Sequence, residues 1–296
     1  MTPVPVPELE RDGGALGAAV AALWELIKVL RAECPWDQVQ TAATIVPHTL
    51  EEAWEVADEA RAVQAAVDIG EDPDLGAFED ELGDLLFQVC FLAMWCEERN
   101  PEVDLASVAR RNFTKLVRRH PHVFGDGAKL TSSDQVLEQW DQIKRGAEER
   151  GLFDGIPKAM PPLGRARKVQ SRAGSIGFDF GDARQALAKL EEEVAELREA
   201  IDQAEADGTL PTGTEMPPDP RTEAETGDVL FAAVNVARLL RVDPEIVTAD
   251  STRTFQNRVE LAIELAAAEH VEFASLELDA QEAWYQRAKA QLSATD

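Results

Sequence analysis

Hydrophobic residues recur about every three to four positions over most of the chain, which is the period of an amphipathic α-helix. Alternating polar and β-branched residues, which would indicate strands, are scarce. Proline and glycine interrupt the pattern, for example at Cys34-Pro35, at Asn100-Pro101 and in the loop 207–220. The pattern predicts helices over residues 14–33, 43–67, 77–98, 104–119, 134–149, 182–205, 221–241, 244–267 and 277–293. We therefore expect an all-α protein.

An internal repeat organises these segments. Five short elements occur in the same order and at similar spacing in each half of the chain. In the first half they are residues 35–37, 51–55, 81–87, 115–119 and 140–144; in the second half they are 177–179, 192–196, 225–231, 254–258 and 285–289. Five elements recurring in order are poorly explained by chance. The repeat predicts two tandem helical units at 14–150 and 165–293, joined by a linker at 151–164 that is rich in proline and glycine.

Acidic residues dominate the charge of the chain. Its formal net charge is −27, so a long nucleic-acid polymer is an unfavourable partner without a concentrated basic patch. The three cysteines form no CxxC pair, which suits a reducing compartment. Residues 1–12 lack the basic n-region of a signal peptide. The mostly apolar stretch 15–30 contains Glu25 and Lys28 and is too short to cross a bilayer. We expect a cytoplasmic protein without a membrane partner.

Pairs of carboxylates three residues apart give the repeat its chemistry. Residues at i and i+3 share a helix face, and each pair lies beside apolar residues. If two such helices pack antiparallel, four carboxylates meet at the edge of a core. The first quartet is then Glu52, Glu55, Glu81 and Asp84, and the second quartet is Glu193, Glu196, Glu225 and Asp228.

Four clustered anions are unfavourable unless a cation or protons neutralise them. Oxygen ligands favour Mg²⁺, with Mn²⁺ as a substitute, over zinc. A di-iron bundle would need Glu-x-x-His pairs, and the sequence contains none. A lone ExxE pair would be read as a solvated helix face, but the paired and repeated arrangement favours a metal centre.

These motifs resemble the EExxE…ExxD signature of the MazG-type nucleoside triphosphate pyrophosphohydrolases. The similarity lies in Glu51-Glu52-x-x-Glu55 with Glu81-x-x-Asp84, and in Glu192-Glu193-x-x-Glu196 with Glu225-x-x-Asp228. Residues 34–37, 115–124 and 169–179 also resemble that family, in its two-domain form. The resemblance implies a homodimeric all-α enzyme that uses Mg²⁺ to hydrolyse nucleoside triphosphates to monophosphate and pyrophosphate, as nucleotide-pool housekeeping.

The mechanism that fits is attack of water on the α-phosphorus, with a carboxylate accepting the water proton. The candidates for that catalytic role are the adjacent glutamate pairs, Glu51 and Glu52 or Glu192 and Glu193. Basic and aromatic residues would bind the substrate: Lys115, Arg119, Trp140 and Lys144 in the first copy, and Lys189, Arg258, Tyr285 and Lys289 in the second. Trp36 and Phe178 occupy equivalent positions and are expected in a core or in the wall of a base pocket.

The two copies differ in their cations. Lys115 of the first copy is replaced by Thr254, whereas Lys189 of the second copy is replaced by His48. Lys189 stands one turn before Glu193, so it can lie beside the metal face or form an ordinary ion pair. Either copy could therefore be the working site, and the sequence leaves this open.

Two other functions remain open from the sequence. One is a nucleotidase of narrower range, such as a deoxynucleotide pyrophosphatase, because the base-selecting residues are not evident. The other is a non-catalytic acidic helical adaptor whose carboxylates bind a basic partner or a regulatory cation. Turnover of nucleotide with Mg²⁺ separates the enzyme from the adaptor.

Overall fold

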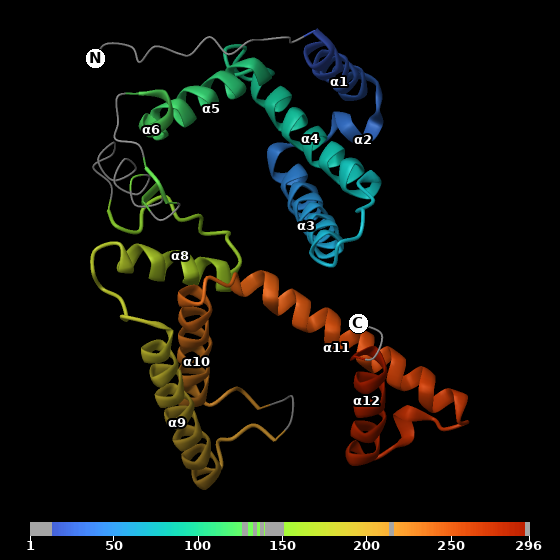
Figure 1. The fold of residues 1–296 in the computed structure, drawn as a ribbon, viewed down its shortest axis with the longest axis vertical. Coiled ribbons are helices and arrows are strands. Elements are labelled where there is room, and N and C mark those ends of the chain that lie inside the picture. Colours follow the sequence, from blue (N-terminus) through green and yellow to red (C-terminus); the bar gives the residue numbers. More distant parts are fainter. Residues whose placement is uncertain are drawn as a thin grey trace. The chain divides into compact units, whose positions relative to one another are not determined.

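A computed structural model describes residues 14–125, 130–132, 135–136, 139, 151–212 and 216–293. Within these ranges the regular elements are all helices, which confirms the predicted all-α class. None of the described helices combines the length and apolar character needed to cross a membrane. The chain divides into two compact units, Met1–Lys144 and Arg145–Asp296, and each is described by itself (Figure 1).

The first unit is built around a pair of long helices. Its helices are α1 (Gly14–Glu33), α2 (Pro35–Gln38), α3 (Ala42–Asp68), α4 (Gly76–Glu97), α5 (Leu105–Arg119) and α6 (Pro121–Phe124). Thr41 caps α3 in a reciprocal capping box with Thr44, and Asp104 caps α5 by accepting a hydrogen bond from the Ser107 amide. Helices α3 and α4 run side by side in opposite directions (Figure 1).

The buried core of the first unit lies where α1, α3 and α4 meet. Ile27, Ile45 and Phe91 come from these three helices, and each is fully buried. Arg31 fastens the end of α1 to the end of α4, because its guanidinium donates to both carboxylate oxygens of Glu98. This packing holds the carboxylate-bearing face of α3 against that of α4.

The second unit repeats the helix pair. Its elements are α8 (Pro162–Gly174), α9 (Ala183–Asp207), α10 (Pro220–Leu239), α11 (Pro244–Ala268), the short 3₁₀ helix η1 (Phe273–Ser275) and α12 (Leu278–Ser293). Asp182, Asp219 and Asp243 cap the starts of α9, α10 and α11. Helices α9 and α10 pack antiparallel, α8 crosses α10, and α11 packs with α12 as a separate hairpin (Figure 1).

Most predicted helix bounds agree with the structure to within a few residues. Helix α8 was missed, because it is only 13 residues long, is rich in basic residues and begins at Pro162, where the proline pair indicates a break. The predicted helix 134–149 falls largely outside the described residues. The predicted linker 151–164 lies at the start of the second unit, and α8 begins within it.

Candidate functional site

The first quartet gathers on the facing sides of α3 and α4. Carboxylate oxygens of Glu52, Glu55 and Glu81 all lie within 4.8 Å of one another. Asp84 borders this group, since its charge raises the pKa of both Glu52 and Glu81. The i, i+3 spacing on two antiparallel helices therefore produces the cluster that the sequence predicts.

The electrostatics of the first quartet are those of crowded anions. Burial is the largest cause that raises the pKa of Glu52, followed by the charges of Asp84 and Glu55. Burial also leads for Glu81, whose pKa is raised further by Glu55 and Asp84. Glu51 stands apart from the cluster: its side chain is exposed, and its carboxylate lies 3.8 Å from the His48 ring nitrogen.

Gln88 is a neighbour of the first quartet that the sequence analysis missed. It is buried one helical turn after Asp84, and it makes a side-chain hydrogen bond to Glu52 that opposes the rise in the pKa of that glutamate. Its Oε1 atom has no hydrogen-bond partner in the described part of the chain. Its position, seven residues after Glu81 on the same helix face, was a signal that could have found it.

The second quartet has the same arrangement on α9 and α10. Carboxylate oxygens of Glu193, Glu196 and Glu225 lie within 4.8 Å of one another. Glu193 is 9% exposed, so this cluster reaches deeper than the first. Burial raises the pKa of Glu196 most, and the charge of Glu193 adds to the rise. Asp228 does not belong to the close group but lines the cavity beside it together with Glu193.

Two cations contact the second quartet. The Lys189 ammonium lies 2.9 Å from a Glu193 oxygen and 2.8 Å from Glu192, and hydrogen bonds to Glu192 and Glu193 raise the pKa of Lys189. Arg221 lies 3.9 Å from Glu225. In the described part of the chain, no Lys or Arg ion pair reaches a member of the first quartet. The two clusters thus have equivalent carboxylates, but among the described residues only the second cluster has cations in contact with it.

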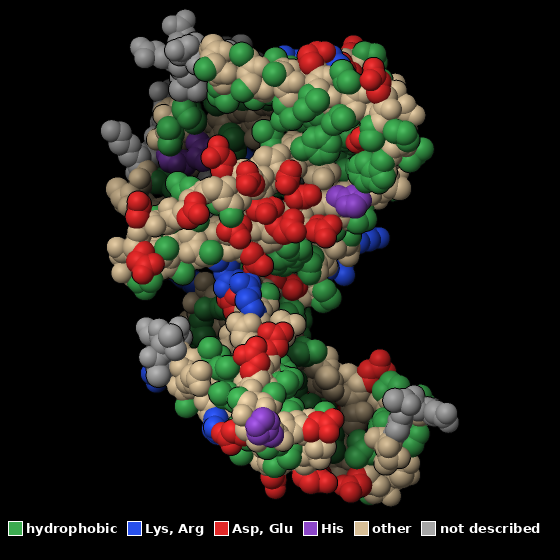
Figure 2. Space-filling view, turned by 90° about the vertical axis from the view of Figure 1, so that its right-hand side faces the viewer, with side chains coloured by type: hydrophobic (Ala, Val, Ile, Leu, Met, Phe, Trp, Pro, Cys, Tyr) green, Lys and Arg blue, Asp and Glu red, His purple; other side chains and the backbone are tan. Residues whose placement is uncertain are grey.

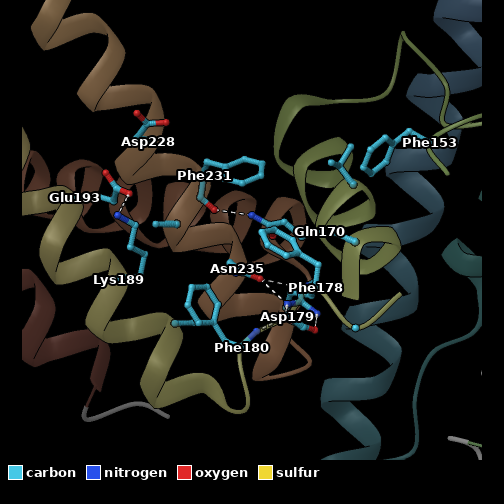
Figure 3. A pocket seen from close by; sticks show the side chains of 16 residues that line it. Phe153, Gln170, Phe178, Asp179, Phe180, Lys189, Glu193, Asp228, Phe231 and Asn235 are labelled. Atoms are coloured by element: carbon cyan, nitrogen blue, oxygen red, sulfur yellow. Dashed lines mark hydrogen bonds and ion pairs between the residues drawn. The ribbon is translucent and has the colours of Figure 1, made fainter. Parts of the chain in front are cut away.

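A cavity of about 590 Å³ opens beside the second quartet. Lys189, Glu193 and Asp228 stand at one end of it, and aromatic rings line the remainder (Figure 3). Those rings belong to Phe153, Phe178, Phe180 and Phe231. Phe178 is 80% exposed, although it is one of the largest apolar side chains in the chain. Polar side chains also belong to the lining, namely Gln170, Asp179, Asn235 and Arg238, and a small-molecule pocket combines such groups with an apolar wall.

Two polar contacts fix the walls of this cavity. Gln170 of α8 donates through Nε2 to the backbone carbonyl of Phe231 on α10 at 2.8 Å, which leaves its buried Oε1 without a partner in the described residues. Arg238 of α10 binds both oxygens of Asp179 in the loop between α8 and α9. Each contact joins residues that lie about sixty positions apart in sequence. Local spacing therefore did not identify Gln170 or Arg238 as site residues, nor Asn235, which also lines the cavity.

Of the other predicted substrate-binding residues, those within the described ranges do not line the cavity. Lys115 and Arg119 lie on α5, where Lys115 is exposed and Arg119 has a buried Nε without a described partner. Arg258 lies on α11, and Tyr285 and Lys289 lie on α12. The centroids of the Tyr285 and Phe255 rings are 5.8 Å apart. Trp140 and Lys144 lie outside the described residues. Substrate binding by these seven residues stays a prediction.

The donor set of both quartets fits a hard divalent cation. Every described group in the two clusters is a carboxylate, and Glu52, Glu81 and Glu196 have raised pKa values because like charges and burial disfavour their ionised forms. A bound cation would relieve that repulsion. No histidine or cysteine belongs to either described cluster, which argues against a zinc site.

Comparisons with known proteins agree with this geometry. The family model of the MazG nucleotide pyrophosphohydrolase domain matches residues 40–124, a range that contains the first quartet. The chain is 37% identical over 264 residues to the nucleoside triphosphate pyrophosphohydrolase of Escherichia coli (strain K12), covering 87% of this chain and 91% of that protein. It is 32% identical over 282 residues to the nucleoside triphosphate pyrophosphohydrolase/pyrophosphatase MazG of Thermotoga maritima, covering 94% and 98%. The chain therefore belongs to the MazG nucleotide pyrophosphohydrolase family.

Proposed function

We propose that this protein hydrolyses nucleoside triphosphates to nucleoside monophosphate and pyrophosphate with Mg²⁺. The observation that carries the proposal is the carboxylate cluster on each antiparallel helix pair, with a cavity suited to a base beside the second one. The names of the relatives from Escherichia coli and Thermotoga maritima support the reaction class.

The second quartet is the proposed working centre. Glu193, Glu196, Glu225 and Asp228 would hold Mg²⁺, and the ion would offset the charge that develops on the triphosphate oxygens. The Lys189 ammonium lies between this cluster and the cavity, where it can bind a phosphate oxygen. Among the described residues, neither a lysine nor an arginine forms an ion pair with a member of the first quartet.

A glutamate next to the cluster is the proposed acceptor of the water proton. Glu192 lies outside the close group of oxygens, and Lys189 holds its carboxylate at 2.8 Å. A carboxylate that is not used as a metal ligand keeps a lone pair for the proton. Glu193 belongs to the cluster itself, so Glu192 is the better candidate in this unit. Glu51 has the equivalent position in the first unit.

The aromatic cavity is the proposed base pocket. An inserted base would stack on phenylalanine rings that otherwise face water, and stacking on an aromatic ring has little preference among bases. The phosphates of the same nucleotide would then extend toward Lys189 and Asp228 at the other end (Figure 3). In this proposal, a base pocket that adjoins a metal centre would bring the α-phosphorus near the carboxylates.

We further propose that the enzyme is a homodimer. Large apolar side chains remain exposed on both carboxylate-bearing helix pairs of the single chain; they include Leu50, Trp54, Leu82, Leu86, Val194, Ile201 and Leu230. Figure 2 shows a band of acidic side chains on the upper part of the molecule, with exposed apolar side chains beside it. A second copy would cover such surfaces, since contiguous exposed apolar area marks an interaction site.

Product analysis tests this function. Purified protein is incubated with Mg²⁺ and each common ribo- and deoxyribonucleoside triphosphate, with and without a chelator. The proposal expects monophosphate and pyrophosphate with several bases, and no turnover under chelation. Turnover of a single deoxynucleotide would restrict the substrate range, and release of orthophosphate and diphosphate would contradict the proposed reaction. Nucleotide binding without turnover would support an adaptor instead.

A further inference from the structure

The two quartets carry the same carboxylates in different charge environments. In the second quartet, Lys189 contacts Glu193 at 2.9 Å and Arg221 contacts Glu225 at 3.9 Å. Both cations stand four residues before their glutamate, on the same helix face. The equivalent positions in the first unit, four residues before Glu52 and Glu81, hold His48 and Ala77.

His48 does not replace Lys189 in the first quartet. Its ring nitrogen lies 3.8 Å from Glu51, which is outside the cluster, and its ring packs edge-on against Trp36 at 5.6 Å. The His48 ring thus contacts residues outside the cluster, and Ala77 has no charged side chain. The first quartet therefore has four carboxylates and no described cation in contact, whereas the second has four carboxylates and two cations.

Gln88 gives a second indication that the first quartet takes a ligand of its own. Its side chain is 6% exposed, it is hydrogen-bonded to Glu52, and its Oε1 atom has no described partner. A buried acceptor without a partner is unfavourable unless water or a ligand supplies one. The equivalent position in the second unit is Ala232, which has no polar side chain. An added oxygen donor beside the first cluster fits a hydrated divalent cation.

We infer that the first quartet binds a divalent cation in the absence of nucleotide, and that the second binds it tightly only together with the triphosphate. In the second unit, Lys189 and Arg221 offset part of the negative charge of the cluster until the polyanionic substrate arrives with its metal. The phosphates then take over the ammonium and guanidinium contacts, which frees the carboxylates for the ion. This inference rests on the proposed function for the second unit, and it gives the first unit a resident metal site.

The size of the effect follows from Coulomb's law. A unit positive charge about 5 Å from a divalent cation in a water-like dielectric weakens binding of that cation about tenfold. Lys189 is closer to the cluster and less exposed than Arg221, with side-chain exposures of 37% and 53%. Its removal should therefore have the larger effect, because exposed pairs at longer distance are screened.

Titration of the metal-free full chain with Mn²⁺, followed by the electron paramagnetic resonance of free Mn²⁺, tests the inference without using turnover. We expect two classes of site whose affinities differ by about tenfold or more. Glu55→Gln should remove the tight class, and Glu196→Gln the weak class. Lys189→Met should strengthen the weak class about tenfold, and a non-hydrolysable α,β-methylene triphosphate should strengthen it in the wild-type chain.

Arg198→Gln is the matched control for Lys189→Met, because it removes a charge from an exposed position on the far side of the same helix. It should leave both classes unchanged. The converse double variant, His48→Lys with Ala77→Arg, should weaken the tight class, and circular dichroism of each variant verifies its fold. Equal affinities in the wild-type chain, or a Lys189→Met variant that behaves as Arg198→Gln does, would overturn the inference.

The outcome separates the inference from the proposed function. If triphosphates are hydrolysed but the two quartets bind Mn²⁺ with equal affinity, the inference about the metal sites is wrong and the proposed hydrolytic activity is supported. If the two classes appear as expected but no triphosphate is hydrolysed, the resident site stands and the proposed function is wrong.

Discussion

Arg238 binds both carboxylate oxygens of Asp179, and this contact ties the loop between α8 and α9 to the C-terminal turn of α10. The loop carries Phe178 and Phe180, which form part of the cavity wall. Arg238 also donates to the Asn235 side chain, so one guanidinium positions two elements of that wall. A bidentate pair of this kind fixes geometry more than a single bond does.

Loss of that contact should weaken nucleotide binding more than it slows the chemical step. Asp179→Ala releases the loop, so we expect KM to rise about five- to tenfold with a smaller change in kcat. Gly174→Ala offers an independent variant, because a Cβ there would lie 2.5 Å from an Asp179 oxygen and would displace it. Steady-state kinetics with one triphosphate measure both; a fall in kcat at unchanged KM would contradict the positioning role.

Phe178 should stack on the base. Its ring is 80% exposed, so Phe178→Ala removes little folding stability, but it should raise KM about tenfold because stacking contributes about 1–3 kcal/mol per base. Phe255→Ala is the matched control, since that ring is 58% exposed on α11 and does not line the cavity. If both variants raise KM equally, the cavity is not the base pocket.

The carboxylates of the first quartet should destabilise the metal-free protein at neutral pH. A carboxyl with a raised pKa in the folded chain keeps its proton to a higher pH than in the unfolded chain, where the pKa is about 4.3. Stability is therefore lost as pH rises from that value through the raised pKa values of Glu52 and Glu81.

Thermal melting in a chelator tests this repulsion. Glu81→Gln should raise the midpoint at pH 7 by about 1–3 °C and reduce its pH dependence, although it removes a proposed ligand. Glu102→Gln, at an exposed position outside the cluster, should change neither. Mg²⁺ should raise the wild-type midpoint more than that of Glu81→Gln. A Glu81→Gln variant that melts lower without metal would contradict the account.

The proposed dimer should be visible in solution. Light scattering on the full chain should give about twice the mass of one chain at micromolar concentration. Replacing exposed apolar residues of the carboxylate helices, such as Leu86→Glu with Leu230→Glu, should shift the protein toward monomer. A control pair at exposed apolar positions outside the carboxylate helices, Leu16→Glu with Leu278→Glu, should leave the mass unchanged. A monomeric wild-type protein would contradict the proposal.

The two carboxylate clusters were accessible from sequence because they depend on local periodicity. Carboxylates at i and i+3 must share a helix face, and the repeat indicated which helices pair, so the clusters of Glu52 and Glu193 could be anticipated. The contact of Lys189 with Glu193 follows from the same geometry. Phe178, expected in a core or a base pocket, lines the cavity.

The cavity itself was not accessible from sequence. It depends on α8, a short and mostly polar helix that follows a proline pair, and on long-range contacts from Gln170 and Arg238 that no local spacing encodes. The splayed α11–α12 hairpin was also unexpected: Arg258, Tyr285 and Lys289 matched the repeat but lie on helices that pack on each other, away from the carboxylate pair (Figure 1). Tertiary packing decides these positions.

Hydrolysis in water labelled with heavy oxygen tests the central claim most directly, when it is carried out on the wild-type chain, Glu55→Gln and Glu196→Gln. Mass spectrometry of the products locates the label. Attack on the α-phosphorus at the second quartet predicts label in the monophosphate, loss of activity in Glu196→Gln and retained activity in Glu55→Gln. Label in pyrophosphate or orthophosphate, or full activity in Glu196→Gln, would contradict it.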